Sequence, residues 1–157
     1  MTEVRIRLTG HQYSDLRRHL LPGDGKEAVA VALCGRTASF GSEVLLFHRM
    51  EFIPYEVCER SGDRIQWPPT LVEPFFRAAA EDDFAIVKVH SHPGGYGRFS
   101  RTDDDSDRTL FDSVYGWVDG DRPHASAIML PDGRMRARQV LPGGVFAQVR
   151  HLSLIHI

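Results

Sequence analysis

The stretch that most constrains this chain is His90-Ser91-His92-Pro93, which directly follows the mostly apolar, β-branched run Phe84–Val89. A run of this kind predicts a strand, and residues two apart on a strand project to the same face of the sheet. We therefore expect His90 and His92 to present both imidazoles at one edge of a sheet. Two neutral imidazoles and one carboxylate from elsewhere make a three-ligand zinc site whose fourth position is open, as in catalytic sites.

A carboxylate that completes this ligand set follows eleven residues after His92, at Asp103. Four aspartates cluster at positions 103, 104, 105 and 107, and such a cluster is also typical of a solvated helix N-terminus. In that interpretation Ser100 is the N-cap and Asp103 lies at N3, as in a capping box. The cap does not exclude ligation, because a rigidly held helix start presents its carboxylate in a fixed position. The spacing selects Asp103 as the ligand and leaves the other three aspartates to surface electrostatics.

A hydrolytic zinc site also needs a general base for its water. Zinc lowers the pKa of a bound water to about 7, and a nearby carboxylate can then accept and relay the proton. The candidates are Glu27, Glu43, Glu51, Glu56, Glu59, Glu73 and Glu81. Most of them lie on polar or alternating stretches that predict a solvated face. Glu27 differs because it heads a predicted buried strand after a Gly-rich turn, but its spacing from the histidines does not by itself select it.

Together these residues resemble the JAMM motif of the JAB/MPN (Mov34/MPN/PAD-1) metalloproteases. That motif is a distant glutamate, then H-[S/T]-H-P, then S-x-x-D, and the resemblance spans residues 4–140. It implies one catalytic Zn²⁺ held by His90, His92 and Asp103. It also implies that Glu27 is the general acid/base and that Ser100 helps to stabilise the tetrahedral oxyanion. The implied fold is α+β, of the MPN/JAB (cytidine-deaminase-like) class, with a curved, mostly antiparallel sheet flanked by helices.

The family resemblance implies a zinc-dependent peptidase or isopeptidase that cleaves after the C-terminal glycine of a ubiquitin-like protein. The stretches VKVHSHPGGY, FSRTDDDSDR and PHASAIMLPDGR are most similar to bacterial JAB domains fused to or encoded with ThiF/E1-like adenylyltransferases. The implied partners are such an adenylyltransferase domain and the C-terminal tail of a ubiquitin-like or sulfur-carrier protein. This chain has no G-x-G-x-x-G loop and is not expected to adenylate anything itself.

Three alternatives stay open beside the isopeptidase. One is a peptidase that processes a sulfur-carrier protein, and another is a non-catalytic MPN scaffold that binds a ubiquitin-like partner. Scaffolds of that kind generally lack a metal ligand, whereas every motif position is matched in this sequence. The third is a purely structural zinc, against which the open fourth position and Glu27 argue.

Composition and charge narrow the remaining classes. The chain has 157 residues, 42% of them hydrophobic and 25% charged, which is ordinary for one globular domain. Its formal net charge is −2 and its basic residues are scattered along the sequence, so we expect no nucleic-acid partner. The charged N-terminus and the lack of a long apolar span predict no membrane association. Cys34 and Cys58 form no metal-type pair and are expected to be reduced, in a cytoplasmic protein.

The resemblance implies one JAB/MPN domain over residues 1–140. The pattern after it predicts a linker at 141–144 and the truncated start of a following segment up to residue 157. The predicted helices are 11–21, one opened by Pro68-Pro69 with Pro74 in its first turn, and 103–113. The predicted strands are 4–8, 27–34, 43–52, 64–67, 84–92, 114–118, 124–130 and 134–140. Pro131-Asp132-Gly133 joins the last two strands as a hairpin.

Overall fold

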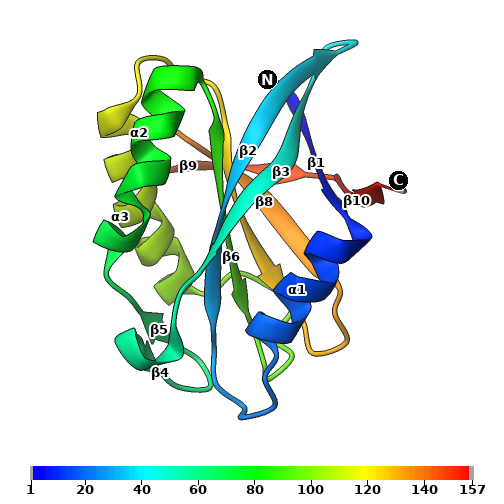
Figure 1. The fold of residues 1–157 in the computed structure, drawn as a ribbon, viewed down its shortest axis with the longest axis vertical. Coiled ribbons are helices and arrows are strands. Elements are labelled where there is room, and N and C mark those ends of the chain that lie inside the picture. Colours follow the sequence, from blue (N-terminus) through cyan, green and yellow to red (C-terminus); the bar gives the residue numbers. More distant parts are fainter. Residues whose placement is uncertain (1, 156–157) are drawn as a thin grey trace.

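The computed structural model describes residues 2–155, which form a curled mixed sheet with one helix on one face and two helices on the other (Figure 1). The helices are α1 (Gly10–Leu20), α2 (Glu73–Asp82) and α3 (Arg101–Trp117). The strands are β1 (Glu3–Thr9), β2 (Val29–Ser39), β3 (Ser42–Phe52), β4 (Glu59–Arg60), β5 (Ile65–Gln66), β6 (Ala85–Ser91), β7 (His124–Met129), β8 (Met135–Leu141), β9 (Val145–Val149) and β10 (His151–Ile155). Two 3₁₀ turns, Tyr55–Val57 and Pro69–Val72, precede β4 and α2.

The main sheet has the strand order β10-β1-β3-β2-β6-β7-β8-β9, and β4 pairs only with β5. Strand β2 is antiparallel to β3 and β6, and β8 is antiparallel to β7 and β9. Parallel pairing joins β1 to β3 and β10, and β6 to β7. The predicted α+β fold with a curved sheet flanked by helices is therefore confirmed.

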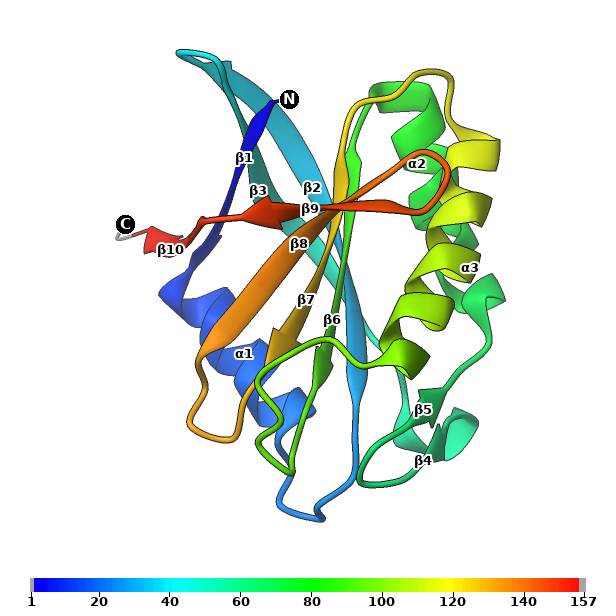
Figure 2. The ribbon, with the colours of Figure 1, turned by 180° about the vertical axis from the view of Figure 1, so that it is seen from behind.

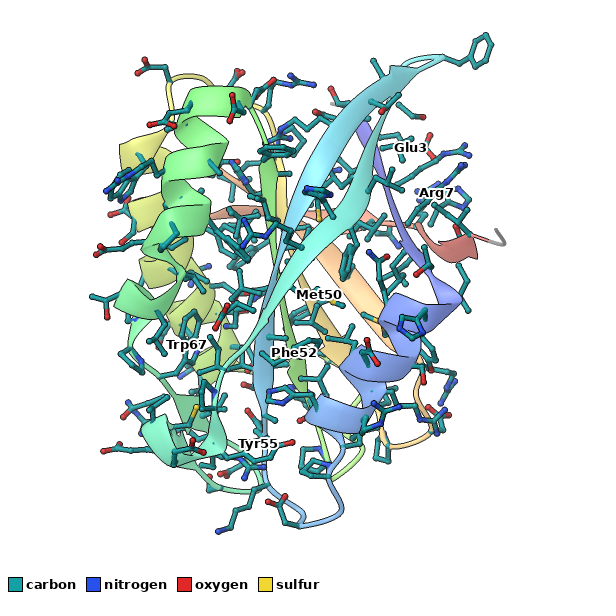
Figure 3. The ribbon with its side chains drawn as sticks, viewed as in Figure 1. Glu3, Arg7, Met50, Phe52, Tyr55 and Trp67 are labelled. Carbon is teal, nitrogen blue, oxygen red and sulfur yellow. The ribbon has the colours of Figure 1, made fainter. Side chains whose placement is uncertain are left out.

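Both faces of the central strands are buried, which explains their nearly continuous apolar sequences. On β2, Ala30 and Ala32 belong to a cluster that α1 covers. The alternate residues Val31 and Leu33 belong to a second cluster that α2 and α3 cover. In Figure 3 the labelled side chains Met50, Phe52 and Tyr55 lie on the α1 side, and Trp67 lies on the α2 side.

The helices agree with the sequence pattern except at one end. Pro74 lies in the first turn of α2, where its missing N–H has no intrahelical partner to lose. The strand predicted at 114–118 is wrong, because Val114 to Trp117 form the last turn of α3. Val114 is buried on the same helix face as Leu110 and Phe111, so a helical repeat and not a strand repeat places it in the core. None of the helices within residues 2–155 has the length and apolar character needed to cross a membrane.

The segment predicted as a linker and the start of a following segment, 141–157, continues the sheet instead. Gly143 and Gly144 have φ angles of +80° and +73°, which glycine adopts readily, and they turn the chain from β8 into β9. Strand β9 then pairs with β8 at one edge of the sheet, and β10 pairs with β1 at the opposite edge. Residues 156–157 lie outside the described residues, and a further domain beyond them stays a prediction.

The curl of the sheet makes this connection short. Only Arg150 separates β9 from β10, although the two strands lie at opposite edges (Figure 2). The side-chain amide of Gln139 on β8 joins the same two regions, because its Nε2 donates to the carbonyl oxygens of Thr2 and Gln148 at 3.1 and 3.3 Å. The chain after Leu141 therefore closes the side of the sheet that α1 leaves open.

Candidate metal centre

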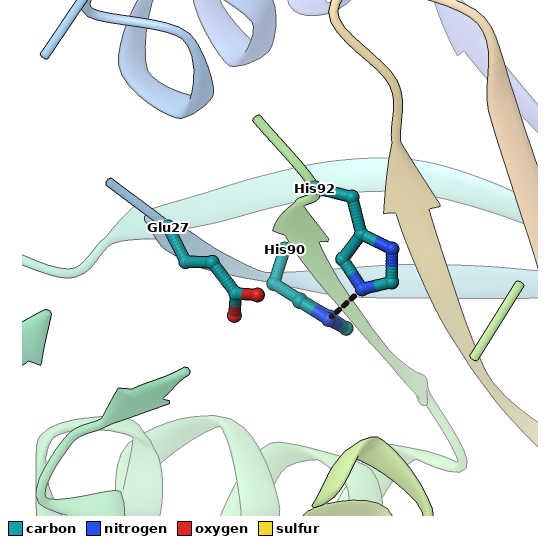
Figure 4. A group of neighbouring side chains, drawn as sticks. All are labelled: Glu27, His90 and His92. Atoms are coloured by element: carbon teal, nitrogen blue, oxygen red, sulfur yellow. Dashed lines mark hydrogen bonds between the residues drawn. The ribbon is translucent and has the colours of Figure 1, made fainter. Parts of the chain in front are cut away.

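The end of β6 carries the two histidines. Strand β6 is buried along its whole length, and its apolar neighbours β2 and β7 hold it on both sides. His90 pairs with Val29 of β2, and Ser91 locks the next position: its Oγ accepts a 2.9 Å hydrogen bond from the Ala28 N–H. The His92 N–H donates to Met129 O of β7 at 2.9 Å, which extends the pairing past the last residue of β6. His90 and His92 consequently project on the same side, with their Nε2 atoms 3.1 Å apart (Figure 4).

The carboxylate of Asp103 reaches both histidines from the first turn of α3. Its Oδ1 lies 2.9 Å from Nε2 of His90, and its Oδ2 lies 3.0 Å from Nε2 of His92. The predicted capping box is present, since Ser100 Oγ accepts from the Asp103 N–H at 3.1 Å and the Ser100 N–H donates to Asp103 Oδ2 at 2.7 Å. The cap thus fixes the carboxylate that faces the imidazoles.

Glu27 stands beside the histidines because of the β2–β6 register. Continuing that antiparallel register from Val29 opposite His90 places Glu27 opposite His92. Backbone contacts hold it there: its N–H donates to Ser61 O at 2.8 Å, and Arg60 Nε donates to its carbonyl oxygen at 2.7 Å. One carboxylate oxygen of Glu27 and one ring nitrogen of each histidine lie within 4.8 Å of one another (Figure 4). Glu27, His90 and His92 therefore form a group that could hold a metal ion.

The donor atoms of this site fit a divalent cation. His92 Nδ1 lies 2.7 Å from the carbonyl oxygen of Tyr96, so Nδ1 carries the ring hydrogen and Nε2 of the neutral ring presents a lone pair. That lone pair faces a carboxylate oxygen of Asp103 and Nε2 of His90, and such an arrangement requires a proton or a cation among the three atoms. The two Nε2 atoms lie 3.1 Å apart, and each lies 2.9 or 3.0 Å from a different carboxylate oxygen of Asp103. These separations are close to the roughly 3.3 Å between two ligands of a tetrahedral zinc with bonds of about 2.0–2.1 Å.

Burial and hydrogen bonding shift the pKa values in the site in different directions. Burial raises the pKa of Glu27 to about 7, and the nearby Asp103 carboxylate adds to the rise while His92 and Lys88 oppose it. Burial lowers the pKa of His90. For Asp103, burial alone would raise the pKa, but the imidazoles of His90 and His92 beside its carboxylate lower it overall. Asp103 is therefore an anion, whereas a carboxyl with the pKa of Glu27 exchanges its proton readily near neutral pH.

A small pocket of about 220 Å³ opens beside the histidines. Its walls are the β4–β5 turn and the loop 94–100. Its lining residues are Glu27, Gly62, Asp63, His92, Gly94, Tyr96 and Ser100. The structure thus brings together all five residues that the sequence singled out, with Glu27, His92 and Ser100 on the pocket wall and His90 and Asp103 behind them.

A second pair of charges, which the sequence reasoning missed, fixes α3 against β6. One helical turn after Asp103, the fully buried Asp107 accepts a 2.8 Å hydrogen bond from Nζ of Lys88, two residues before His90. Arg138 of β8 also donates to Asp107, at 2.8 Å, and to Asp104 at 2.6 Å. The available signal was the lysine within an otherwise apolar strand, since a buried ammonium requires a partner. Lys88 and His90 are two residues apart on β6, and Asp107 and Asp103, which they contact, are four residues apart on α3. Each pair therefore lies on one face of its element.

Comparisons with known proteins were consistent with this architecture. A family model described as prokaryotic homologs of the JAB domain matches residues 10–140. Among solved structures, protein DSY2949 from Desulfitobacterium hafniense superposes with a TM-score of 0.59 and 16% sequence identity, covering 96% of this chain and 94% of that chain. Among curated proteins, none matches the chain.

Proposed function

The chain belongs to the family of prokaryotic JAB domains, and on that basis we propose that it is a zinc-dependent peptidase or isopeptidase that cleaves after the C-terminal glycine of a ubiquitin-like protein. The observation that carries this proposal is the convergence of His90, His92 and Asp103 on one point, with Glu27 beside them at a pocket. A structural zinc site needs no such neighbouring acid and no pocket.

His90, His92 and Asp103 would hold the metal through two ring nitrogens and one carboxylate, a donor set that suits zinc. When bound, zinc supplies an acidified water and polarises the carbonyl of the bond to be cleaved. The Tyr96 carbonyl keeps Nδ1 of His92 protonated, so that Nε2 is the ligating nitrogen, and the Ser100 cap holds Asp103 in place.

Glu27 and Ser100 are the residues placed to act on the substrate. Glu27 borders the pocket and is nearly fully buried, so it can take a proton from the attacking water and give one to the departing amine. Ser100 Oγ already accepts the Asp103 N–H, which leaves its own hydroxyl hydrogen to donate to the oxyanion of the tetrahedral intermediate.

The size of the pocket supports a glycine at the cleavage site. About 220 Å³ is below the range of about 300–1,000 Å³ that is usual for small-molecule pockets. An extended chain end without side chains fits such a volume, whereas a bulky residue next to the cleaved bond does not.

Metal content and hydrolysis measured on the same preparations test the proposal. We expect one zinc per chain in the wild type and in Glu27→Gln, and none in His92→Ala. Of these three proteins, only the wild type is expected to release the fluorophore from a ubiquitin-like protein–GlyGly–fluorophore substrate. His11→Ala is the matched control, because the His11 side chain is 90% exposed on α1. A wild type without zinc, or full activity in Glu27→Gln, contradicts the proposal.

The other expectations drawn from the sequence resemblance stand as proposals beside this one. Family membership also accommodates a non-catalytic scaffold, which would bind a ubiquitin-like protein without cleaving it; the complete donor set favours the peptidase. A sulfur-carrier tail as substrate, a ThiF/E1-like adenylyltransferase as partner and a cytoplasmic location complete the proposed setting.

A further inference from the structure

A second and larger hollow adjoins the candidate metal centre. This groove, of about 630 Å³, lies between the loop 97–99 and the surfaces of β8 and β9, the two strands that face the viewer in Figure 2. The loop 94–100 separates it from the pocket, since Gly94, Tyr96 and Ser100 line the pocket while Gly97 and Phe99 line the groove. Four arginines line the groove, and none of its lining residues is acidic: Arg98, Arg136, Arg138 and Arg150.

One of these arginines has its charge compensated within the fold. Arg138 binds Asp104 and Asp107, and its guanidinium is stacked between the rings of Phe99 and Phe146, at 3.8 and 3.7 Å from their centroids. It forms a rigid, flat part of the groove with aromatic rings on both sides. A floor of this kind can contact the apolar part of an incoming chain.

The positive charges of the other three arginines are not compensated by any carboxylate of the described residues. Within residues 2–155, Arg98, Arg136 and Arg150 form no ion pair with a carboxylate. The Arg150 Nε donates to the side-chain oxygen of Gln148 at 3.4 Å, a weak neutral contact. Arg98 and Arg136 are exposed.

Two of these like charges also lie beside the last pair of the β8–β9 ladder. Ala137 pairs with Val149 at the end of the antiparallel β8–β9 ladder, and Arg136 and Arg150, the residues next to this last pair, both line the groove. Like charges opposite one another on neighbouring strands destabilise a sheet. An anionic group that binds between them removes this repulsion, so the arrangement favours an acidic ligand.

We propose that this groove binds an acidic polypeptide segment of the protein whose C-terminal tail enters the neighbouring site. The inference rests on the proposed function for the identity of that protein. Apolar residues of the groove, Met135, Val149 and Leu152 among them, suit a polypeptide better than a sugar-phosphate chain.

Binding of a fluorescein-labelled twelve-residue peptide of glutamate and leucine, followed by anisotropy, tests the groove directly. The variants are Arg98→Glu, Arg136→Glu and the double variant, each first checked for an unchanged thermal unfolding midpoint. Arg77→Glu on α2 is the matched control, since Arg77 is exposed and does not line the groove. We expect the wild type and the control to bind alike, the double variant to bind at least about tenfold more weakly, and affinity to fall with added salt.

Three outcomes overturn the proposal. Equal binding in all variants excludes the groove. Tighter binding of a single-stranded RNA twelve-mer than of the peptide, lost in the same variants, assigns the groove to nucleic acid. Concentration-dependent dimers in light scattering, abolished by Arg136→Glu, assign it to a second copy of this chain.

A kinetic comparison separates the groove from the catalytic proposal. The double variant is expected to hydrolyse a short GlyGly–fluorophore peptide as the wild type does, while its KM for an acidic ubiquitin-like protein–GlyGly–fluorophore fusion rises. An unchanged KM for the fusion contradicts the groove proposal alone. Hydrolysis of neither substrate by the wild type contradicts the proposed function, and the anisotropy result then still decides the groove.

Discussion

His124 is a buried histidine that the candidate site does not use, and its surroundings keep it neutral. Its Nδ1 accepts a 2.8 Å hydrogen bond from the Ile86 N–H, and its Nε2 lies 3.4 Å from a guanidinium nitrogen of Arg36. The ring of Tyr115 packs edge-on against it. Burial, and to a smaller extent Arg36, lowers the pKa of His124 from 6.5 to about 3.

This depressed pKa predicts a loss of stability in mild acid. The unfolded chain binds a proton at His124 below pH 6.5 and the folded chain does so only near pH 3, so the stabilisation is complete above pH 6.5 and is lost as the pH falls. Between pH 7.5 and 5.0 the loss from this residue is about 2 kcal/mol. His124→Asn, which retains an acceptor near Nδ1, is expected to show a smaller loss in urea unfolding at the two pH values. His11→Asn is the exposed control, and equal losses in wild type and His124→Asn contradict the prediction.

At the level of elements, α3 and β6 are joined by two successive contacts, Asp103 with His90 and Asp107 with Lys88. Removing one partner of a buried ion pair leaves the other charge uncompensated, at a cost of about 3–5 kcal/mol. Asp107→Asn is therefore expected to lower the free energy of unfolding by about 3 kcal/mol and to weaken zinc binding, because it loosens the helix that presents Asp103. The exposed Asp105→Asn is the control. Urea unfolding and zinc titration measure both effects, and unchanged zinc affinity in Asp107→Asn would show that the second contact does not position the first.

The β7–β8 hairpin makes contact with α1 through a glycine. Gly133 has a φ of +87°, and a Cβ atom there would lie 2.4 Å from the hydroxyl oxygen of Tyr13 and 2.7 Å from Arg17, while the Tyr13 hydroxyl donates to the Gly133 carbonyl oxygen. Gly133→Ala therefore combines backbone strain with a steric clash, and we expect it to cost at least about 1 kcal/mol more than Gly120→Ala. Gly120 also has a positive φ but no atom within 4 Å of the added Cβ. Equal thermal unfolding midpoints of the two variants contradict this prediction.

The parts of the structure that could be predicted from the sequence are those that depend on residues close together in the chain. The histidines share one strand, and Ser100 and Asp103 share one helix start, so spacing alone indicates that part of the site. Glu27 reaches it only through the β2–β6 register, 63 residues away in sequence, and family resemblance was needed to select it. The prediction of a strand at 114–118 was wrong for a different reason: a short apolar run fits a helix and a strand equally well.

At the scale of the whole molecule, the arginine groove shows what no local pattern contains. Arg136 and Arg150 lie at the end of the β8–β9 pair and Arg98 on the loop 94–100, and only the fold brings the three together into one groove. Glycine pairs such as Gly143-Gly144 occur both in linkers and in turns between strands, so the sequence alone does not distinguish the two. The pairing of β9 with β8 and of β10 with β1 shows that this pair forms a turn.

The closing segment makes a prediction for the molecule as a whole. Deleting residues 145–157 uncovers the edges of β8 and β1 and removes Gln148 O, one of the acceptors of the buried Gln139 amide. We expect the thermal unfolding midpoint to fall by about 10 °C and the shortened chain to self-associate through its free edges. Gln139→Leu in the full chain, which leaves the edges covered, is expected to lose less stability and to stay monomeric in light scattering. A shortened chain as stable as the full one contradicts the closing role.

The place of β10 also determines the order in which this chain can complete its fold during synthesis. Strand β1 pairs with β3 on one side and with β10 on the other, so β1 keeps one edge open until the last described strand has been synthesised. Its contact order is therefore high, and folding is expected to be slow compared with that of a helical domain of this size. Until then the open edge of β1 can pair with other nascent chains, so we expect the incomplete chain to be prone to association.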